Sequence, residues 1–146
     1  MMKKIRWGIL GTGSIASKFA EALKSMDDSV LAAVGSRTDV RAGQFAEKYQ
    51  IEKAYGSYED LAKDPDIDVI YIAVPHTEHK ATAKLCLMNK KAVLCEKPFT
   101  LNSKDTEELI SIARENKVFL MEAMWTKFLP ATIKIKKWID EGKIGN

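Results

Sequence analysis

The segment with the clearest chemical meaning is the glycine-rich loop at residues 11–16, which has the pattern G-x-G-x-x-A. It directly follows a mostly apolar run and opens a segment whose apolar residues recur at helical spacing. Gly11 permits a tight turn, Gly13 lets a pyrophosphate approach the backbone, and Ala16 is small enough for close packing of helix on strand. The free N–H groups and positive end of such a helix attract phosphate, so the loop predicts a dinucleotide site. A tight turn that holds no ligand is the alternative.

The end of the second apolar run bears on which dinucleotide would bind. An NAD-binding domain usually places a carboxylate about 20 residues beyond the glycines, where it holds the ribose 2′-hydroxyl. This sequence has Ser36 and Arg37 there, a hydroxyl and a guanidinium that favour a 2′-phosphate through charge-assisted hydrogen bonds. We therefore expect NADP rather than NAD, although Asp39 could still reach the ribose after a shift of the loop. Arg41 is either a second phosphate ligand or a solvated helix residue.

Two histidines follow the apolar run at 69–74 and stand where a further strand would end. Pro75 stops that strand, and Thr77 is expected to cap the helix that carries His79. The favoured role for His76 and His79 is contact with the ribose and nicotinamide of the cofactor. A capped helix start with partly exposed imidazoles is the structural alternative. A metal site is not expected, because H-x-x-H is weak evidence and no third ligand can be identified.

A lysine follows the next apolar run, within the sequence Cys-Glu-Lys-Pro at 95–98. Lys97 stands beside Glu96 and is restricted to an extended conformation by the proline that follows it. An ammonium group there could stabilise a developing alkoxide or assist proton transfer at a substrate hydroxyl or carbonyl oxygen. Taken alone, the same lysine would equally be half of a surface ion pair.

The elements that must position these residues alternate between short apolar runs and segments of helical period. Strands that are apolar on both faces are typical of a parallel sheet covered by helices. The sequence thus predicts an α/β fold with an open, doubly wound parallel sheet, a Rossmann dinucleotide-binding domain. Ser57 and Ser103 are expected to cap helices. We expect strands at 5–10, 29–34, 53–55, 69–74, 92–95 and 118–121, and helices at 15–24, 40–49, 58–62, 77–88, 103–114 and 131–141.

Length and composition limit the alternatives. The 146 residues fit one domain of ordinary size, and 23 lysines and arginines against 20 acidic residues give a formal charge of +3 without a basic block. Neither a nucleic acid nor a membrane is an expected partner. Cys86 and Cys95 lack metal-ligand or disulfide-scaffold spacing, which favours free thiols in a reducing cytoplasm.

Taken together, these motifs resemble the cofactor domain of the glucose-fructose oxidoreductase, inositol dehydrogenase and MocA family, and the resemblance spans the whole chain. Glu-Lys-Pro at the end of a strand is its most specific part. The segment 120–130 further resembles the subgroup that contains dimeric dihydrodiol dehydrogenase and NADP-dependent xylose dehydrogenases. The resemblance implies that Lys97 is the lysine of the catalytic site. It implies cofactor contacts from Gly11, Gly13, Ser14 and Ile15 at the pyrophosphate, Ser36 and Arg37 at the adenosine end, Pro75, His76, His79 and Glu96 along the nicotinamide ribose, and Trp125 near the nicotinamide and substrate. Simple helix packing is the alternative for Trp125.

The resemblance also implies that cofactor binding and substrate binding lie in different domains. Family members are roughly twice as long, and their second domain supplies much of the substrate pocket and the usual acid/base residue. We therefore expect a dinucleotide-binding domain at 1–125 and, at 126–146, a helix leading into a second domain that the sequence does not include. The function expected is hydride transfer between NADP and a sugar, polyol or dihydrodiol-type small molecule, in a homo-oligomer. A stand-alone, dinucleotide-sensing module without catalysis is the rival interpretation.

Overall fold

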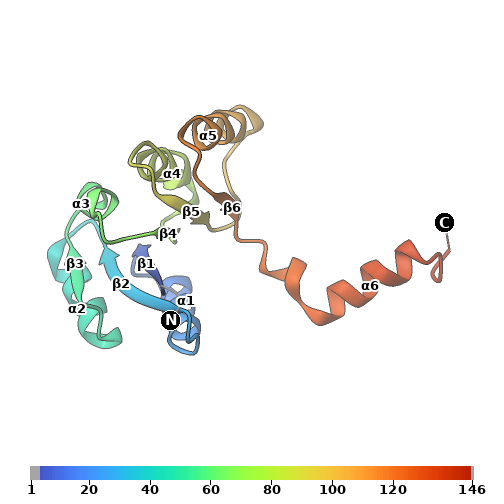
Figure 1. The fold of residues 1–146 in the computed structure, drawn as a ribbon, viewed down its shortest axis with the longest axis horizontal. Helices are drawn as coiled ribbons and strands as arrows, with labels where there is room; N and C mark the ends of the chain where they lie inside the picture. The colour runs from blue at the N-terminus through green and yellow to red at the C-terminus, as the bar shows by residue number, and fades with distance from the viewer. Residues whose placement is uncertain (1–3, 146) are drawn as a thin grey trace.

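The computed structural model describes residues 4–145 and contains one parallel six-stranded sheet (Figure 1). The strand order is β3-β2-β1-β4-β5-β6, so the direction of strand addition reverses between β1 and β4. This is the switch point of a doubly wound sheet, where ligands bind beyond the carboxyl ends of the strands. The predicted fold class is confirmed. The strands are β1 (Ile5–Leu10), β2 (Ser29–Gly35), β3 (Lys53–Tyr55), β4 (Val69–Ile72), β5 (Ala92–Cys95) and β6 (Leu120–Glu122).

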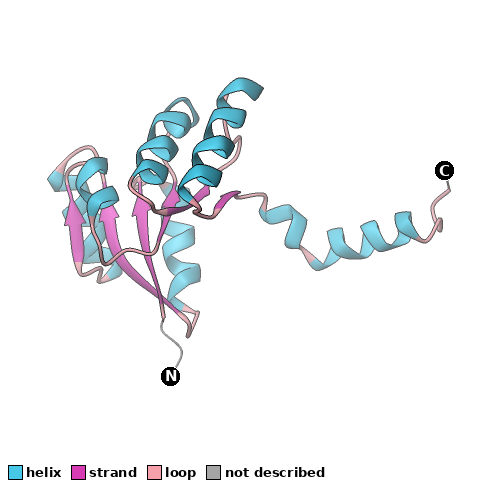
Figure 2. Ribbon diagram, turned by 45° about the horizontal axis from the view of Figure 1, so that its top comes forward, coloured by secondary structure: helices cyan, strands magenta, loops and turns pink. Residues whose placement is uncertain are grey.

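Helices cover both faces of the sheet (Figure 2). One face packs against the first two helices and the other face packs against the next three, which gives two separate hydrophobic clusters. Neighbouring strand residues point to opposite clusters: Ile9 lies in one and Leu10 in the other, both fully buried. The apolar strands are thus covered on both sides, as a parallel sheet requires. The helices are α1 (Ser14–Lys24), α2 (Asp39–Tyr49), α3 (Tyr58–Lys63), α4 (His79–Met88), α5 (Ser103–Asn116) and α6 (Pro130–Asp140).

Two of the expected helix starts differ from the structure. The region before α4 is a short 3-10 helix, η1 (His76–Glu78), so Thr77 lies inside a turn and caps nothing. The cap of α5 is Asn102, whose side chain accepts a hydrogen bond from the Asp105 amide; Ser103 is the first helical residue. Asparagine and serine are comparably good caps, and the sequence placed both side by side. The expected cap at Ser57 is confirmed by its bond from the Asp60 amide at 3.1 Å.

The last helix stands apart from the sheet. A second 3-10 helix, η2 (Trp125–Phe128), leads into α6, which extends away from the rest of the protein (Figure 1). None of the described residues of α6 is buried. Its large apolar side chains are exposed over a third to more than half of their surface, among them Ile133 at 57% and Trp138 at 39%.

Candidate cofactor and active site

A cavity of about 640 Å³ opens beyond the carboxyl ends of β1, β2 and β4. It lies at the predicted switch point and brings together residues from the glycine loop, the end of β2 and the end of β4. The structure places eight of the predicted cofactor residues in its wall: Gly11, Gly13, Ser14, Ile15, Ser36, Arg37, Arg41 and Pro75.

The two glycines of the loop have different physical roles. Gly11 has φ of +104°, and a Cβ atom there would lie 2.4 Å from the Ala73 carbonyl oxygen, so the turn requires glycine. Gly13 has no neighbouring atom within 4 Å of a Cβ position, which leaves open space above its backbone. That space fits a pyrophosphate that must approach the main chain closely.

The start of α1 leaves its first N–H groups available to a ligand. Gly13 is the N-cap, it has no side chain to cap the helix, and the described first turn contains no acidic residue. Ala16 is fully buried, which matches the expected close packing of this helix on the sheet. The open N–H groups and the helix dipole favour an anion at this point, so the residues present fit a dinucleotide.

The end of the cavity that lies next to the turn between β2 and α2 is positively charged. Ser36 is buried and donates its main-chain N–H to the Tyr55 carbonyl at 3.0 Å, while Arg37 and Arg41 are exposed on the cavity wall. Asp39, the carboxylate that could have bound the ribose of NAD, does not line the cavity. Its carboxylate packs against Gly56, where a Cβ would lie 2.2 Å from Oδ1. The acidic side chain is thus directed at the loop before α3.

Eight further residues of the wall were not identified from the sequence, and three of them, Gln44, Lys48 and Tyr58, have polar side chains on α2 and α3. Gln44 and Lys48 continue the exposed face of α2 from Arg41, and the half-buried Tyr58 begins α3. Burial raises the pKa of Tyr58, although the charge of Arg37 opposes this shift. The helical spacing of 41, 44 and 48 was the available signal, because residues three and four apart share one face of a helix.

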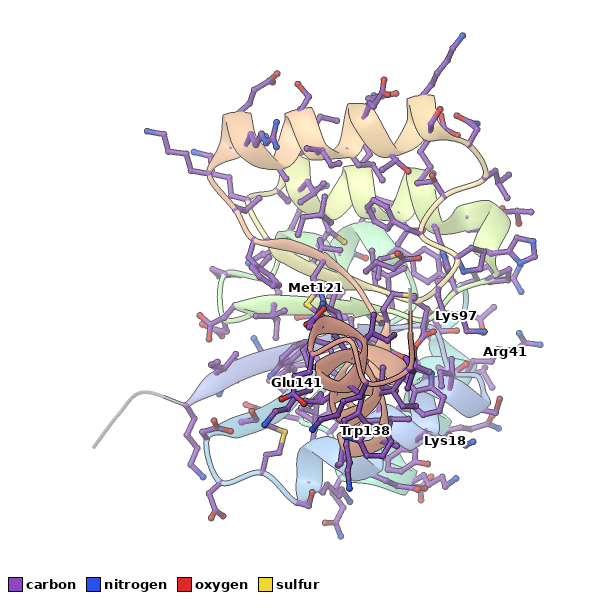
Figure 3. The ribbon with its side chains drawn as sticks, turned by 90° about the vertical axis from the view of Figure 1, so that its right-hand side faces the viewer. Lys18, Arg41, Lys97, Met121, Trp138 and Glu141 are labelled. Carbon is purple, nitrogen blue, oxygen red and sulfur yellow. The ribbon has the colours of Figure 1, made fainter. Side chains whose placement is uncertain are left out.

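The loop that carries Lys97 is fixed by hydrogen bonds from its main-chain N–H groups. The Glu96 N–H donates to the Ile72 carbonyl at 3.0 Å, and the Phe99 N–H donates to Glu122 Oε1 at 2.9 Å. The peptide bond between Lys97 and Pro98 is cis. Lys97 itself is exposed, and Arg41 and Lys97 project toward the same side of the molecule in Figure 3. The backbone is therefore held while the ammonium group stays accessible.

The two histidines have different environments. His79 is 1% exposed, with Nδ1 2.8 Å from the Pro98 carbonyl and Nε2 3.0 Å from the Val74 carbonyl. Its imidazole thus joins the end of β4 to the loop after Lys97 and lies beneath the surface of the site. Cofactor contact, metal binding and partial exposure were the only roles that the sequence suggested for this residue. His76 is exposed and lies outside the cavity wall, beside Lys80 and Leu101.

Glu96 lies beside Lys97 but is largely buried, at 8% exposure. The Tyr71 hydroxyl donates to its Oε1 at 2.5 Å, and the Lys97 N–H donates to its Oε2 at 3.2 Å. Burial, followed by the hydrogen bond to this carboxylate, raises the pKa of Tyr71 well above its usual value. Burial likewise raises the pKa of Cys95 to about 12, so this thiol stays protonated and unreactive at neutral pH.

Trp125 lies at the start of η2 and is 59% exposed, outside the cavity wall. Within residues 4–145, no group of three or more His, Cys, Asp or Glu side chains is placed to hold a metal ion. None of the helices in this described range is long and apolar enough to cross a membrane.

Comparison with known proteins agrees with this geometry. The profile of the Gfo/Idh/MocA oxidoreductase family, described as an NAD-binding Rossmann fold, matches residues 5–124. The chain belongs to this family. The match spans the sheet and ends just before η2, so it includes the glycine loop, the end of β2 and the Lys97 loop.

Relatives and solved structures extend the match to α6. The chain is 46% identical over 144 residues to trans-1,2-dihydrobenzene-1,2-diol dehydrogenase from Mus musculus and 45% identical to that from Homo sapiens, covering 97% of this chain and 43% of each relative. A 3-ketoreductase from Actinomadura kijaniata, solved with TDP-benzene and NADP, superposes with a TM-score of 0.91 at 30% identity over 99% of this chain and 46% of that one. A probable dehydrogenase from Thermotoga maritima gives 0.90 at 32% identity over 97% and 42%. The chain thus spans less than half the length of these proteins.

Proposed function

We propose that this chain is the NADP-binding part of an oxidoreductase that transfers hydride between nicotinamide and a hydroxyl compound such as a sugar, polyol or dihydrodiol. The observation that carries the choice of NADP is the charge of the cavity. Arg37, Arg41 and Lys48 contribute to its wall, and none of the described residues that line it is an aspartate or glutamate. A wall with cations and no carboxylate favours the additional phosphate of NADP. The solved 3-ketoreductase with NADP, to which the chain is similar, supports this choice.

We propose a role for each residue that its position and chemistry support. The first turn of α1 binds the pyrophosphate, and Ser36 with Arg37 binds the 2′-phosphate. Glu96 accepts hydrogen bonds from the nicotinamide ribose, and Lys97 directs its ammonium at the reacting oxygen, where it stabilises developing negative charge. His79 holds the loop that carries both residues. The bound dinucleotide supplies or accepts the hydride.

The proposal includes a domain arrangement. Residues 1–125 form the dinucleotide-binding domain, and 126–146 lead into a second domain that supplies most of the substrate pocket and the acid/base residue. The relatives' length supports this division, because each is more than twice as long as the matched region. This chain alone should therefore bind dinucleotide and catalyse no hydride transfer. Steady reduction of NADP by a sugar or diol in the purified chain would contradict the division. If the natural full-length protein binds dinucleotide but catalyses no reaction, the dinucleotide-sensing module is favoured instead.

Cofactor choice can be tested on this chain directly. NADPH should bind more tightly than NADH by about 1–3 kcal/mol, the scale of a charge-assisted contact, and Arg37→Ala should remove most of that difference. Fluorescence titration measures both affinities. Lys104→Ala, an exposed cation on α5 outside the cavity, is the matched control and should leave the difference unchanged. Equal affinities in the unmodified chain would exclude the role given to Arg37.

Catalysis by Lys97 requires the longer protein. There, Lys97→Ala should lower turnover about 100-fold or more while the affinity for NADPH changes little, because the lost interaction is with the reacting oxygen. Steady-state kinetics and a separate binding titration distinguish the two effects. If affinity falls and turnover does not, Lys97 is a cofactor contact only.

A further inference from the structure

Tyr71 is a buried polar side chain at the centre of the sheet whose position calls for an explanation. It lies on β4, paired in register with Ile9 of β1 and with Leu94 of β5, and it is 2% exposed. A hydroxyl buried at such a place costs free energy unless it forms a hydrogen bond. Its partner is the Glu96 carboxylate, at the end of the neighbouring strand.

We propose that Tyr71 is a positioning residue that orients the Glu96 carboxylate for the nicotinamide half of the cofactor and links it to the pyrophosphate-binding helix. This inference rests on the proposed function of Glu96. Each carboxylate oxygen of Glu96 accepts one hydrogen bond, Oε1 from the Tyr71 hydroxyl at 2.5 Å and Oε2 from the Lys97 N–H at 3.2 Å. Two donors fix the rotation of a carboxylate that one donor would leave free.

The Tyr71 hydroxyl is the donor of its hydrogen bond with Glu96. A phenol in this environment remains protonated at physiological pH, because burial and the nearby carboxylate both oppose its ionisation. The phenol therefore has a proton to donate, and a carboxylate oxygen accepts it. The remaining lone pairs of Glu96 are left for a donor such as a ribose hydroxyl.

The ring of Tyr71 makes the second contact of the link. It stacks on Phe19 of α1, with ring centroids 3.8 Å apart and planes inclined by 18°. Trp7 of β1 also contacts Phe19, in a T-shaped arrangement with ring centroids 5.3 Å apart. Since α1 begins at the glycine loop, the helix that receives the pyrophosphate packs directly on the residue that holds Glu96. A displacement of one is therefore transmitted to the other through packed side chains.

The experiment compares the two halves of the cofactor in this chain. Tyr71→Phe keeps the stacked ring and removes only the hydroxyl. NADPH affinity should fall about fivefold to tenfold, the scale of one hydrogen bond, while the affinity for adenosine 2′,5′-bisphosphate, which has no nicotinamide, should not change. Tyr55→Phe is the matched control, because the Tyr55 hydroxyl also donates to a carboxylate, Asp64 Oδ2, at 3.0 Å, and neither side chain lines this cavity. It should change neither affinity.

A second variant tests whether Tyr71 acts through Glu96. In a Glu96→Ala background, which removes the acceptor, Tyr71→Phe should have less than a twofold further effect on NADPH affinity. Additive losses, equal losses for both ligands, or an equal loss in Tyr55→Phe would overturn the inference and leave the proposed function in place. If the unmodified chain binds the bisphosphate and NADPH with equal affinity, the inference fails together with the ribose contact proposed for Glu96, while the proposed binding of NADP in the cavity stands. If it binds neither ligand, the proposed function fails and the inference fails with it.

Discussion

The sheet with its five packed helices and the segment formed by η2 and α6 are both rich in apolar side chains, but they bury them to opposite extents. Leu61 of α3 and Ile70 of β4 are fully buried, whereas Ile133 and Ile135 of α6 are 57% and 50% exposed. Apolar composition alone therefore does not bury a helix. A partner surface must lie within reach, and in the described structure α6 contacts chiefly η2, which precedes it.

The sequence connection accounts for the difference. Each of α1 to α5 lies between two parallel strands, so the right-handed crossover returns the chain to the sheet and lays the helix on it. No described strand follows α6, and nothing brings this helix back. A contiguous apolar surface larger than a few hundred Å² is seldom left bare and commonly marks an interface. We therefore interpret α6 as a helix whose exposed apolar side chains form an interaction surface.

The largest contrast should appear in stability. Leu61→Ala should lower the free energy of unfolding by about 2–5 kcal/mol, because it opens a cavity in the core beneath Gly8 and Gly35. Ile135→Ala, the matched truncation on α6, should change it by less than about 0.5 kcal/mol. Urea unfolding followed by circular dichroism measures both. A large loss for Ile135→Ala would show that α6 packs on the rest of the chain in solution.

The two loop glycines should separate folding from binding within the packed region. Gly11→Ala should cost about 1–3 kcal/mol of stability, because its positive φ and the nearby Ala73 carbonyl both disfavour a side chain. Gly13→Ala should leave stability within about 0.5 kcal/mol of the unmodified chain, since open space surrounds the new methyl group.

Dinucleotide titration completes this comparison. Gly13→Ala should weaken NADPH binding about tenfold or more, because the methyl group occupies the space that a pyrophosphate needs. If a stably folded Gly13→Ala variant binds NADPH with unchanged affinity, this loop is excluded as the pyrophosphate site.

Exposure of the last segment should show in the association state. We expect the chain to self-associate through Trp125, Phe128, Leu129, Ile133 and Trp138, most simply as a symmetric dimer with the same patch on both copies, or to lose the α6 helix. In the first case, Trp138→Glu should raise the dissociation constant about tenfold, whereas Lys136→Ala, on another side of α6, should not. Light scattering over a concentration series, with the helix content from circular dichroism, measures this. A monomer with intact α6 at high concentration would contradict both alternatives.

Much of the site could be predicted because its signals are local. Gly11 and Ala16 are set by the geometry of one turn and one helix, and eight of the predicted cofactor residues lie together in one cavity. His79 could not be placed in this way. Its two carbonyl partners belong to residues 5 positions before it and 19 positions after it, and the sequence gives no sign that they meet.

The sequence by itself determined the order of strands and helices, the glycine turn and the position of Lys97 at a strand end, because backbone stereochemistry and the period of apolar residues act over a few positions. Only the tertiary structure decided which polar groups face a ligand and which face each other. Asp39 packs on Gly56, Tyr71 donates a hydrogen bond to Glu96, and no part of residues 4–145 buries α6. These outcomes depend on partners far along the chain, or on their absence from residues 4–145, and a short-range pattern carries no information about either.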